Sequence, residues 1–299
     1  MENSFPNPQQ PLVSVVMVVY DPNPNYFRKS VESIVNQQCS DWELIIVETP
    51  SPRSASEILQ EIPDSRIRHF VNSQGTSLVE QRNRAFQEAR GHFIALMDAD
   101  DIAHPFRLTK QINFLRNHPN IDVIGSQVGV IDSEDRISGY RWFPSLHEDI
   151  RRSIVQVVPL CQPAVMLRRE VVDRLGGYQF TAFAVGEDYE YWSRLLRAGV
   201  RFANLPDVLL YYRLHPSQLK QSKLDETIRA VLHVRKLYWS DRIDYRARLR
   251  IWGEHVLLYM PKRLVAWFLL KVRWHYKSSP MAPRVWPTRA AKTLIKVDA

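Results

Sequence analysis

Several residue types on which common sites depend are scarce in this chain of 299 residues. It contains two cysteines, Cys39 and Cys161, and their spacing fits neither a disulfide framework nor a cysteine-built zinc site. Such scarcity suits a reducing cytosol. There are only 10 glycines, and no GXXXXGK[ST] loop, no GXGXXG after a strand and no HEXXH. A glycine-rich loop that cradles phosphate is therefore not expected.

Signals for export or for a membrane span are also missing. The opening MENSFPNPQQP is polar and proline-rich, unlike a signal peptide. The apolar run LVAWFLL, residues 264–270, is far shorter than the roughly 20 residues that span a bilayer. We therefore expect a cytoplasmic protein, with the inner face of the cytoplasmic membrane as a further expected location.

The formal net charge of +8 is unevenly distributed. Residues 240–299 carry thirteen Lys/Arg against four Asp/Glu, a net charge of +9. The remaining 27 basic and 28 acidic residues nearly cancel. Because the part before residue 240 is near neutral and has no nucleic-acid-binding motif, we do not expect nucleic acid as a partner.

Apolar runs of strand length alternate with segments of helical periodicity. The expected strands span residues 12–20, 42–48, 66–72, 92–98, 122–132, 163–168 and 207–214. The expected helices span residues 26–38, 54–62, 76–91, 106–117, 187–198 and 218–239, the third of them closed by Gly91. Strands separated by helices predict a parallel sheet with helices on both faces, whose ligands bind at the carboxyl ends of the strands.

The fourth expected strand runs into an acidic cluster. In FIALMDADD, the carboxylates of Asp98, Asp100 and Asp101 follow an apolar run. Each pair of like charges about 4 Å apart costs roughly 4 kcal/mol at an effective dielectric near 20, so a positive partner is expected. Mg²⁺ takes one or two carboxylates together with substrate phosphates, which makes Asp98 and Asp100 candidate ligands. Alternatively, Asp100 and Asp101 cap the helix after Pro105 or form an Asx turn.

Several ordered motifs strengthen the first interpretation. MDADD, together with VSVVMVVY, WELIIVE, EQRNRAFQEARGHFIALMDADD and GEDYEYWSRLLRAG, resembles the family 2 glycosyltransferases of the GT-A fold, over about residues 12–216. The resemblance implies an α/β fold with a Rossmann-like, mostly parallel central sheet flanked by helices. It implies a catalytic domain over 1–239, with a nucleotide-sugar half (about 12–132) and an acceptor half (about 133–239). A basic, aromatic helical extension would follow over 240–299.

The resemblance assigns the first two strand ends to the nucleotide. It places Tyr20 and Asp21 near the base, although Tyr20 is also explained as a partly buried strand-end residue. Glu48 would accept a hydrogen bond from the base. Thr49 and Pro50 stand where relatives carry a second acid and a glycine, so the identity of the base is left open.

Two further residues are assigned to the diphosphate by the same resemblance. Arg82 would reach a phosphate or orient the carboxylates; alternatively it is an exposed helical residue paired with Glu80 or Glu88. His215 would join the metal shell or contact the diphosphate; alternatively it is a hydrogen-bonded structural residue. Asp98 would serve both the donor and the metal.

The acids of GEDYEYWSRLLRAG lie at the expected start of a helix. The resemblance makes Asp188 the general base for the acceptor hydroxyl, with Glu187 orienting the acceptor or tuning its neighbour. Helix capping by the two acids is the alternative.

The implied reaction is direct displacement at a nucleotide-diphospho-sugar, with inversion, onto a hydroxyl of a glycan or lipid-linked acceptor. A divalent cation, Mn²⁺ or Mg²⁺, would lie between the DXD carboxylates and the diphosphate. One alternative is a catalytically silent GT-A-like scaffold at the membrane surface, suggested by the unusual VETPSPRS. The other is a DXD phosphohydrolase, which the position of the motif and Ile102 disfavour.

The last expectation concerns the segment 251–277. Its apolar residues and tryptophans, among them Trp267 and Trp274, are flanked by basic residues. This pattern predicts a helix that lies in the interface of an anionic membrane. The alternative is that the segment packs on the catalytic domain.

Overall fold

The computed structural model describes residues 10–215, 224–243 and 245–260. The strands are β1 (Val13–Val19), β2 (Trp42–Glu48), β3 (Ile67–Val71), β4 (Phe93–Asp98), β5 (Ile102–Ala103), β6 (Val123–Ile131), β7 (Ile137–Arg141), β8 (Met166–Arg168) and β9 (Phe202–Arg213). The α-helices are α1 (Pro24–Val35), α2 (Ala55–Gln60), α3 (Leu78–Glu88), α4 (Arg107–Asn117), α5 (His147–Ser153), α6 (Arg169–Leu175), α7 (Glu187–Arg197), α9 (Leu224–Trp239) and α10 (Tyr245–Leu257).

All nine strands form one sheet, in the order β3-β2-β1-β4-β8-β6-β9-β5, with β7 paired to β6. The pairs β1 with β2, β1 with β4, β2 with β3 and β6 with β9 are parallel. The central β8 is antiparallel to both neighbours. The prediction of a mostly parallel sheet is confirmed. Because β1, β2 and β4 all run the same way, Tyr20, Glu48 and Asp98 lie at one edge of the sheet.

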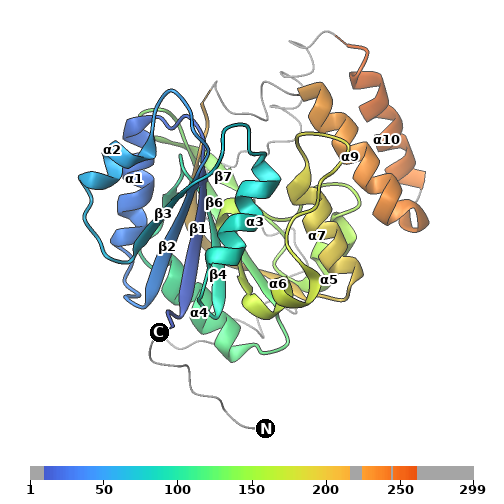
Figure 1. The fold of residues 1–299 in the computed structure, drawn as a ribbon. Helices are drawn as coiled ribbons and strands as arrows, with labels where there is room; N and C mark the ends of the chain where they lie inside the picture. Colours follow the sequence, from blue (N-terminus) through green and yellow to red (C-terminus); the bar gives the residue numbers. More distant parts are fainter. Residues whose placement is uncertain (1–9, 216–223, 244, 261–299) are drawn as a thin grey trace.

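Helices cover both faces of this sheet (Figure 1). One face packs on apolar residues of α1, α2 and α4, such as Phe27 and Leu108, and the other on residues of α3, α5, α6, α7 and α9, such as Phe86 and Trp192. Burial on both faces explains why β1 and β2 are continuous apolar runs rather than alternating ones.

The structure corrects three expected boundaries. The strand predicted over 163–168 begins only at Met166, because Gln162–Ala164 form a 3₁₀ helix. The helix predicted over 76–91 ends at Glu88, where Ala89 turns to an extended conformation, so Gly91 does not close it. Gly91 instead lies against the start of β1, where a Cβ atom would be 2.5 Å from the Ser14 nitrogen. The last strand begins at Phe202, well before residue 207, because its first half pairs with β6.

The described part of the C-terminal extension consists of a 3₁₀ turn and α10, which lies on the outer side of α9 (Figure 1). Arg235 of α9 is buried and pairs with Glu254 of α10. Within the described ranges, no helix is both long and apolar enough to cross a membrane. Trp267, Trp274 and the run LVAWFLL lie outside the described residues.

Candidate active site

The acidic loop, residues 98–101, connects β4 to β5 at the carboxyl edge of the sheet. Asp98, Asp100 and Asp101 each offer a carboxylate oxygen, and these three oxygens lie within 4.8 Å of one another. Asp101 is buried; its Oδ1 accepts a 2.8 Å hydrogen bond from the Arg213 backbone, and its Oδ2 has no partner among the described residues. Burial, and then the charges of Asp100 and Asp98, raise the pKa of Asp101 well above its ordinary value.

This donor set fits a divalent cation. Carboxylate oxygens are the ligands that Mg²⁺ and similar hard ions prefer, and an unpaired buried oxygen beside two further carboxylates is an arrangement that a cation stabilises. The alternative of helix capping is wrong, because α4 begins after Phe106 without any side-chain cap. Helix capping therefore does not explain the acidic loop, and the Asx turn remains the alternative to a cation site.

His215 lies beside the acidic loop, a position that fits both the metal-shell role and the hydrogen-bonded structural role given as its alternative. Its Nε2 is 2.8 Å from Asp100 Oδ2. The two residues are 115 positions apart in the chain and meet because β5, which follows the loop, pairs with the end of β9. One candidate ligand thus contacts another directly.

Arg82 is not the exposed helical residue of the alternative prediction. Its guanidinium is mostly buried and pairs with Glu187 at the start of α7. Glu80 instead forms a capping box with Ser77, and Glu88 pairs with Arg68. Burial alone would lower the pKa of Arg82, but the charges of Glu187, Tyr178, Asp98 and Asp188 together outweigh it and raise the pKa.

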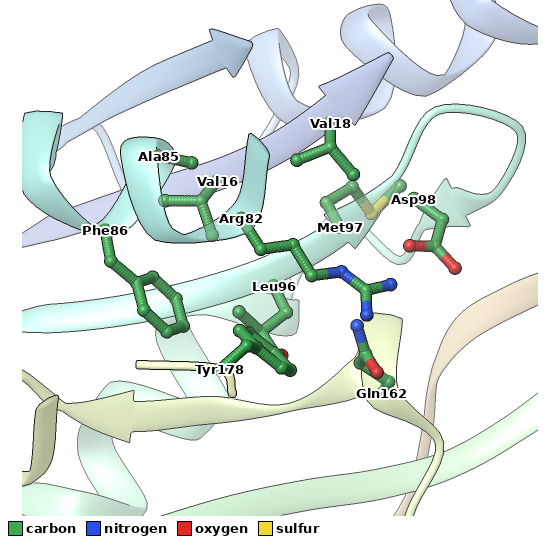
Figure 2. Close-up of a pocket in the computed structure, with 10 residues that line it drawn as sticks. All are labelled: Val16, Val18, Arg82, Ala85, Phe86, Leu96, Met97, Asp98, Gln162 and Tyr178. Atoms are coloured by element: carbon green, nitrogen blue, oxygen red, sulfur yellow. The ribbon is translucent and has the colours of Figure 1, made fainter. Parts of the chain in front are cut away.

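Figure 2 shows the surroundings of Arg82, with Asp98, Gln162 and Tyr178 around its guanidinium. The guanidinium lies over the Tyr178 ring, 5.1 Å from its centroid. Because Arg82 can only donate, the Gln162 amide is assigned with its oxygen toward the guanidinium, where it accepts a 2.6 Å hydrogen bond from Nη2. The cavity here has a volume of about 10 Å³, so it is too small for a sugar. It is a packed contact behind the site, not the substrate cleft.

The acids at the start of α7 are both nearly buried. The N-cap of this helix is Gly186, with a φ of 87° and no side-chain cap bond, but Asp188 accepts from a backbone N–H of the first turn, so the capping alternative still holds for Asp188. Glu187 faces Arg82, while Asp188 Oδ1 accepts a 2.8 Å bond from the Tyr189 backbone. The sequence analysis placed both acids at the start of a helix. In the structure this helix start contacts α3 through the Glu187–Arg82 ion pair.

The end of β1 combines an exposed ring with a fixed ion pair. Tyr20 is 66% exposed, so the alternative of a partly buried strand-end residue is wrong. Asp21 has a φ of 45° and receives two 2.8 Å bonds, from Nε and Nη2 of Arg53. The hydrogen bond from Arg53 holds the pKa of Asp21 below its ordinary value. Arg53 escaped the sequence analysis, although it lies within VETPSPRS.

Glu48, predicted to contact the base, is only 2% exposed. Its Oε1 accepts a 2.8 Å bond from the Ala55 backbone, and its Oε2 lies 2.8 Å from His69 Nε2. The carboxylate thus holds the start of α2. The neighbouring Thr49 has a buried Oγ1 without a partner among the described residues.

Comparison with known proteins agrees with this geometry. Residues 14–176, more than half of the chain, match the model of glycosyl transferase family 2. An uncharacterized glycosyltransferase of Methanocaldococcus jannaschii is 29% identical over 275 residues, covering 88% of this chain and 92% of the relative. WfaP of Escherichia coli, a UDP-Glc:α-D-GlcNAc-diphosphoundecaprenol β-1,3-glucosyltransferase, is 27% identical over 73% of this chain and 83% of its own.

Among solved structures, the mannosyltransferase PcManGT of Pyrobaculum calidifontis, in complex with GDP-Man and Mn²⁺, superposes with a TM-score of 0.57. The alignment covers 97% of this chain and 82% of that protein at 16% identity, a likeness that concerns the fold. The curled sheet with helices on both faces is thus a GT-A fold. The chain belongs to glycosyl transferase family 2 and is a glycosyltransferase.

Proposed function

We propose that this protein transfers a sugar from a nucleotide-diphospho-sugar to an acceptor hydroxyl, with inversion at the anomeric carbon. The observation that carries the proposal is the convergence of three separate segments at one sheet edge: the acidic loop, His215 and the start of α7. Such a site needs no protein nucleophile. It needs a group that holds the diphosphate and a base for the acceptor.

Asp98, Asp100 and His215 would hold a divalent cation, Mn²⁺ or Mg²⁺. When bound, the cation supplies Lewis acidity toward the diphosphate oxygens. Asp101 fixes the acidic loop to the end of β9, because its buried Oδ1 accepts a hydrogen bond from the Arg213 backbone N–H. The Mn²⁺ named with PcManGT supports this proposal, as does the unpaired Asp101 Oδ2.

Asp188 is the proposed general base, which takes the proton of the acceptor hydroxyl. Glu187 does not need to touch the acceptor, because its carboxylate is engaged with Arg82. Arg82 then has two tasks. It orients the start of α7 through Glu187, and it carries positive charge close to Asp98 and the diphosphate side of the site.

For the nucleotide, we propose that Tyr20 offers its exposed ring to the base, with a stacking contribution of about 1–3 kcal/mol. Asp21, fixed by Arg53, follows Tyr20 directly in the chain and is the carboxylate proposed beside the base. Glu48 would support this pocket through α2 rather than through direct base contact. The names of the relatives include both UDP-Glc and GDP-Man, so both bases belong in a test.

For the acceptor, we propose a glycan or lipid-linked hydroxyl, supported by the diphosphoundecaprenol in the name of WfaP. Within this proposal, residues 1–239 are the catalytic domain, with donor and acceptor halves at about 12–132 and 133–239. Residues 240–299 form a basic extension that contacts the cytoplasmic face of an anionic membrane. An apolar stripe on α10 supports that contact: Tyr245, Leu249, Trp252 and Val256 are all exposed.

The test is nucleotide release from a panel of UDP- and GDP-sugars by the full-length protein, with Mn²⁺ or Mg²⁺ and with lipid-linked and soluble acceptors. We expect Asp188→Asn and Asp98→Asn each to lower kcat about 100-fold or more. Asp173→Asn, at an exposed position of α6, is the matched control and should retain activity.

NMR of the product would report the anomeric configuration, and retention would contradict the proposed displacement. Cleavage of phosphomonoesters would favour the hydrolase alternative. Turnover of no donor at all, with or without an acceptor, would favour the silent scaffold.

A further inference from the structure

Arg213, the last residue of β9, is a buried cation directly beneath the acidic loop. Its backbone N–H donates to Asp101 Oδ1 at 2.8 Å, and its Nε donates to the Asp100 carbonyl oxygen at 2.8 Å. One residue therefore holds a side chain and the backbone of the loop together. His215 follows two positions later and contacts Asp100 from the other side.

The guanidinium is anchored at its far end by the turn between β6 and β7. Nη1 donates to the Asp132 carbonyl at 3.0 Å and pairs with Asp135 Oδ1 at 2.5 Å. Asp135 has a φ of 64°, and Lys29 of α1 pairs with its other oxygen. The turn is thereby tied to both Arg213 and α1.

Aromatic packing completes this arrangement. The Arg213 guanidinium lies over the Tyr26 ring, 4.3 Å from its centroid, and the Tyr26 ring is 5.6 Å from that of His215. A planar guanidinium donates in fixed directions while its face stacks on a ring, which an ammonium group cannot do. The shape of this side chain, not only its charge, determines where its partners lie.

The acidic loop needs such a support, because its three carboxylates repel one another and would move apart without a tether. We infer that Arg213 is a positioning residue of the metal site: by holding Asp100, Asp101 and His215 together, it sets the arrangement that a divalent cation would meet. This inference rests on the proposed function and deepens it. Arg213 itself touches neither the cation nor the substrate.

The test is the Mn²⁺ affinity of the full-length protein, measured from the free Mn²⁺ signal in electron paramagnetic resonance, with UDP and with GDP. Groups that orient metal ligands typically contribute about 10- to 100-fold to affinity, so we expect Arg213→Lys to weaken Mn²⁺ binding by that factor. The KM for Mn²⁺ should rise in parallel. Binding of the metal-free nucleotide should change little.

Arg136→Ala is the matched control. Arg136 lies in the same turn and pairs with the Asp132 side chain, but its own side chain is 75% exposed and makes no ion pair with the acidic loop. This variant should keep its Mn²⁺ affinity within twofold of the wild type. Asp135→Asn keeps Arg213 while weakening its anchor, and should give an intermediate loss; it carries the test if Arg213→Lys does not fold.

A purely structural role for Arg213 would appear as a lower unfolding temperature with Mn²⁺ affinity within twofold of the wild type in the folded variants, and that result would overturn the inference. A wild-type protein that does not bind Mn²⁺ would also overturn the inference. The proposed function would not fail with it, because metal-independent transfer would still be seen in the donor assay. A wild type that binds Mn²⁺ but consumes no donor removes the proposed function only, and the comparison among variants still decides the inference.

Discussion

At the scale of single residues, Gly91 lies close against the backbone at the start of β1. Its N–H donates to Ser14 Oγ at 2.7 Å, and Ser14 Oγ in turn donates to Glu43 Oε1 at 2.6 Å. A Cβ on Gly91 would lie 2.5 Å from the Ser14 nitrogen and 2.7 Å from the Val13 carbonyl carbon. These are backbone atoms of a central strand, which cannot move without disturbing both neighbouring strands. Glycine is required here for space.

We therefore predict that Gly91→Ala lowers the free energy of unfolding by about 1–3 kcal/mol or more, the usual cost of overpacking a rigid site. Urea denaturation followed by circular dichroism measures it. Gly253→Ala is the control, because a Cβ there meets nothing within 4 Å, and alanine in a helix is favoured by up to about 1 kcal/mol. Equal stability of the two variants would contradict the assigned contact.

How far single residues could be predicted from the sequence depends on the distance along the chain to their partners. Asp98 and Asp100 follow a recognisable apolar strand, and so were found by local pattern. The partner of Arg82 is Glu187, 105 positions away, and an isolated helix offered only the wrong partners Glu80 and Glu88. Arg213 stands two residues before His215, and was missed because nothing local shows that it is buried.

At the scale of elements, α3 and α7 belong to the two halves proposed for the catalytic domain and meet through one mostly buried ion pair. Arg82 and Glu187 contribute it, and the side chain of each is no more than 13% exposed. Asn83 of α3 adds a second link, because its amide group exchanges two hydrogen bonds with the Tyr178 backbone. The start of α7 is thus positioned from the helix that precedes the acidic strand.

We predict that Glu187→Gln and Arg82→Met each lower the free energy of unfolding by about 3–5 kcal/mol, since each leaves a buried charge unpaired. The double variant should lose clearly less than the sum, with a coupling of about 1–3 kcal/mol in urea denaturation. Arg151→Met, at an exposed pair with Glu148, should cost about 1 kcal/mol or less. Additive losses would show that the pair does not join the helices.

Helices and strands could be predicted where their buried residues follow a regular pattern in the sequence. The strand over 42–48 was placed at its observed bounds, because all seven of its residues are buried and apolar runs of that length indicate a strand. The short β5 and β7 were missed, since β5 has two residues and the first two residues of β7, which pairs only with β6, are exposed. The end of α3 was misplaced because a glycine near a helix end usually indicates a C-cap. Gly91 is instead required by its close approach to the backbone of β1.

At the scale of the whole molecule, α10 presents its apolar residues outward. Tyr245, Leu249, Trp252 and Val256 recur at intervals of three and four, so they lie on one helical face, and Trp252 is 69% exposed. The opposite side is attached to α9 through Glu254 and Arg235. In the sequence, this stripe belongs to residues 240–299, which carry a net charge of +9. Exposed aromatic residues beside a net positive charge favour an anionic lipid surface.

We predict that the full-length protein co-sediments with vesicles of phosphatidylcholine and phosphatidylglycerol, and that the double change Leu249→Ser and Trp252→Ser weakens this partitioning at least about tenfold. Burial of each such side chain contributes roughly 1.5–3 kcal/mol, and about 1.4 kcal/mol is a factor of ten. Raising the salt concentration should weaken binding further, because part of the attraction is electrostatic.

Phe180→Ser is the control for that experiment, since Phe180 is as exposed as Trp252 but lies in the loop before α7. It should bind vesicles like the wild type. If the wild type, the double variant and Phe180→Ser all bind equally, the stripe does not contact lipid. If the double variant binds like the wild type but binding is lost on vesicles without phosphatidylglycerol, charge alone attracts the protein. Only a loss of vesicle binding in the double variant, with Phe180→Ser unaffected, places α10 at the bilayer. A lipid-linked acceptor would then be within reach of the site.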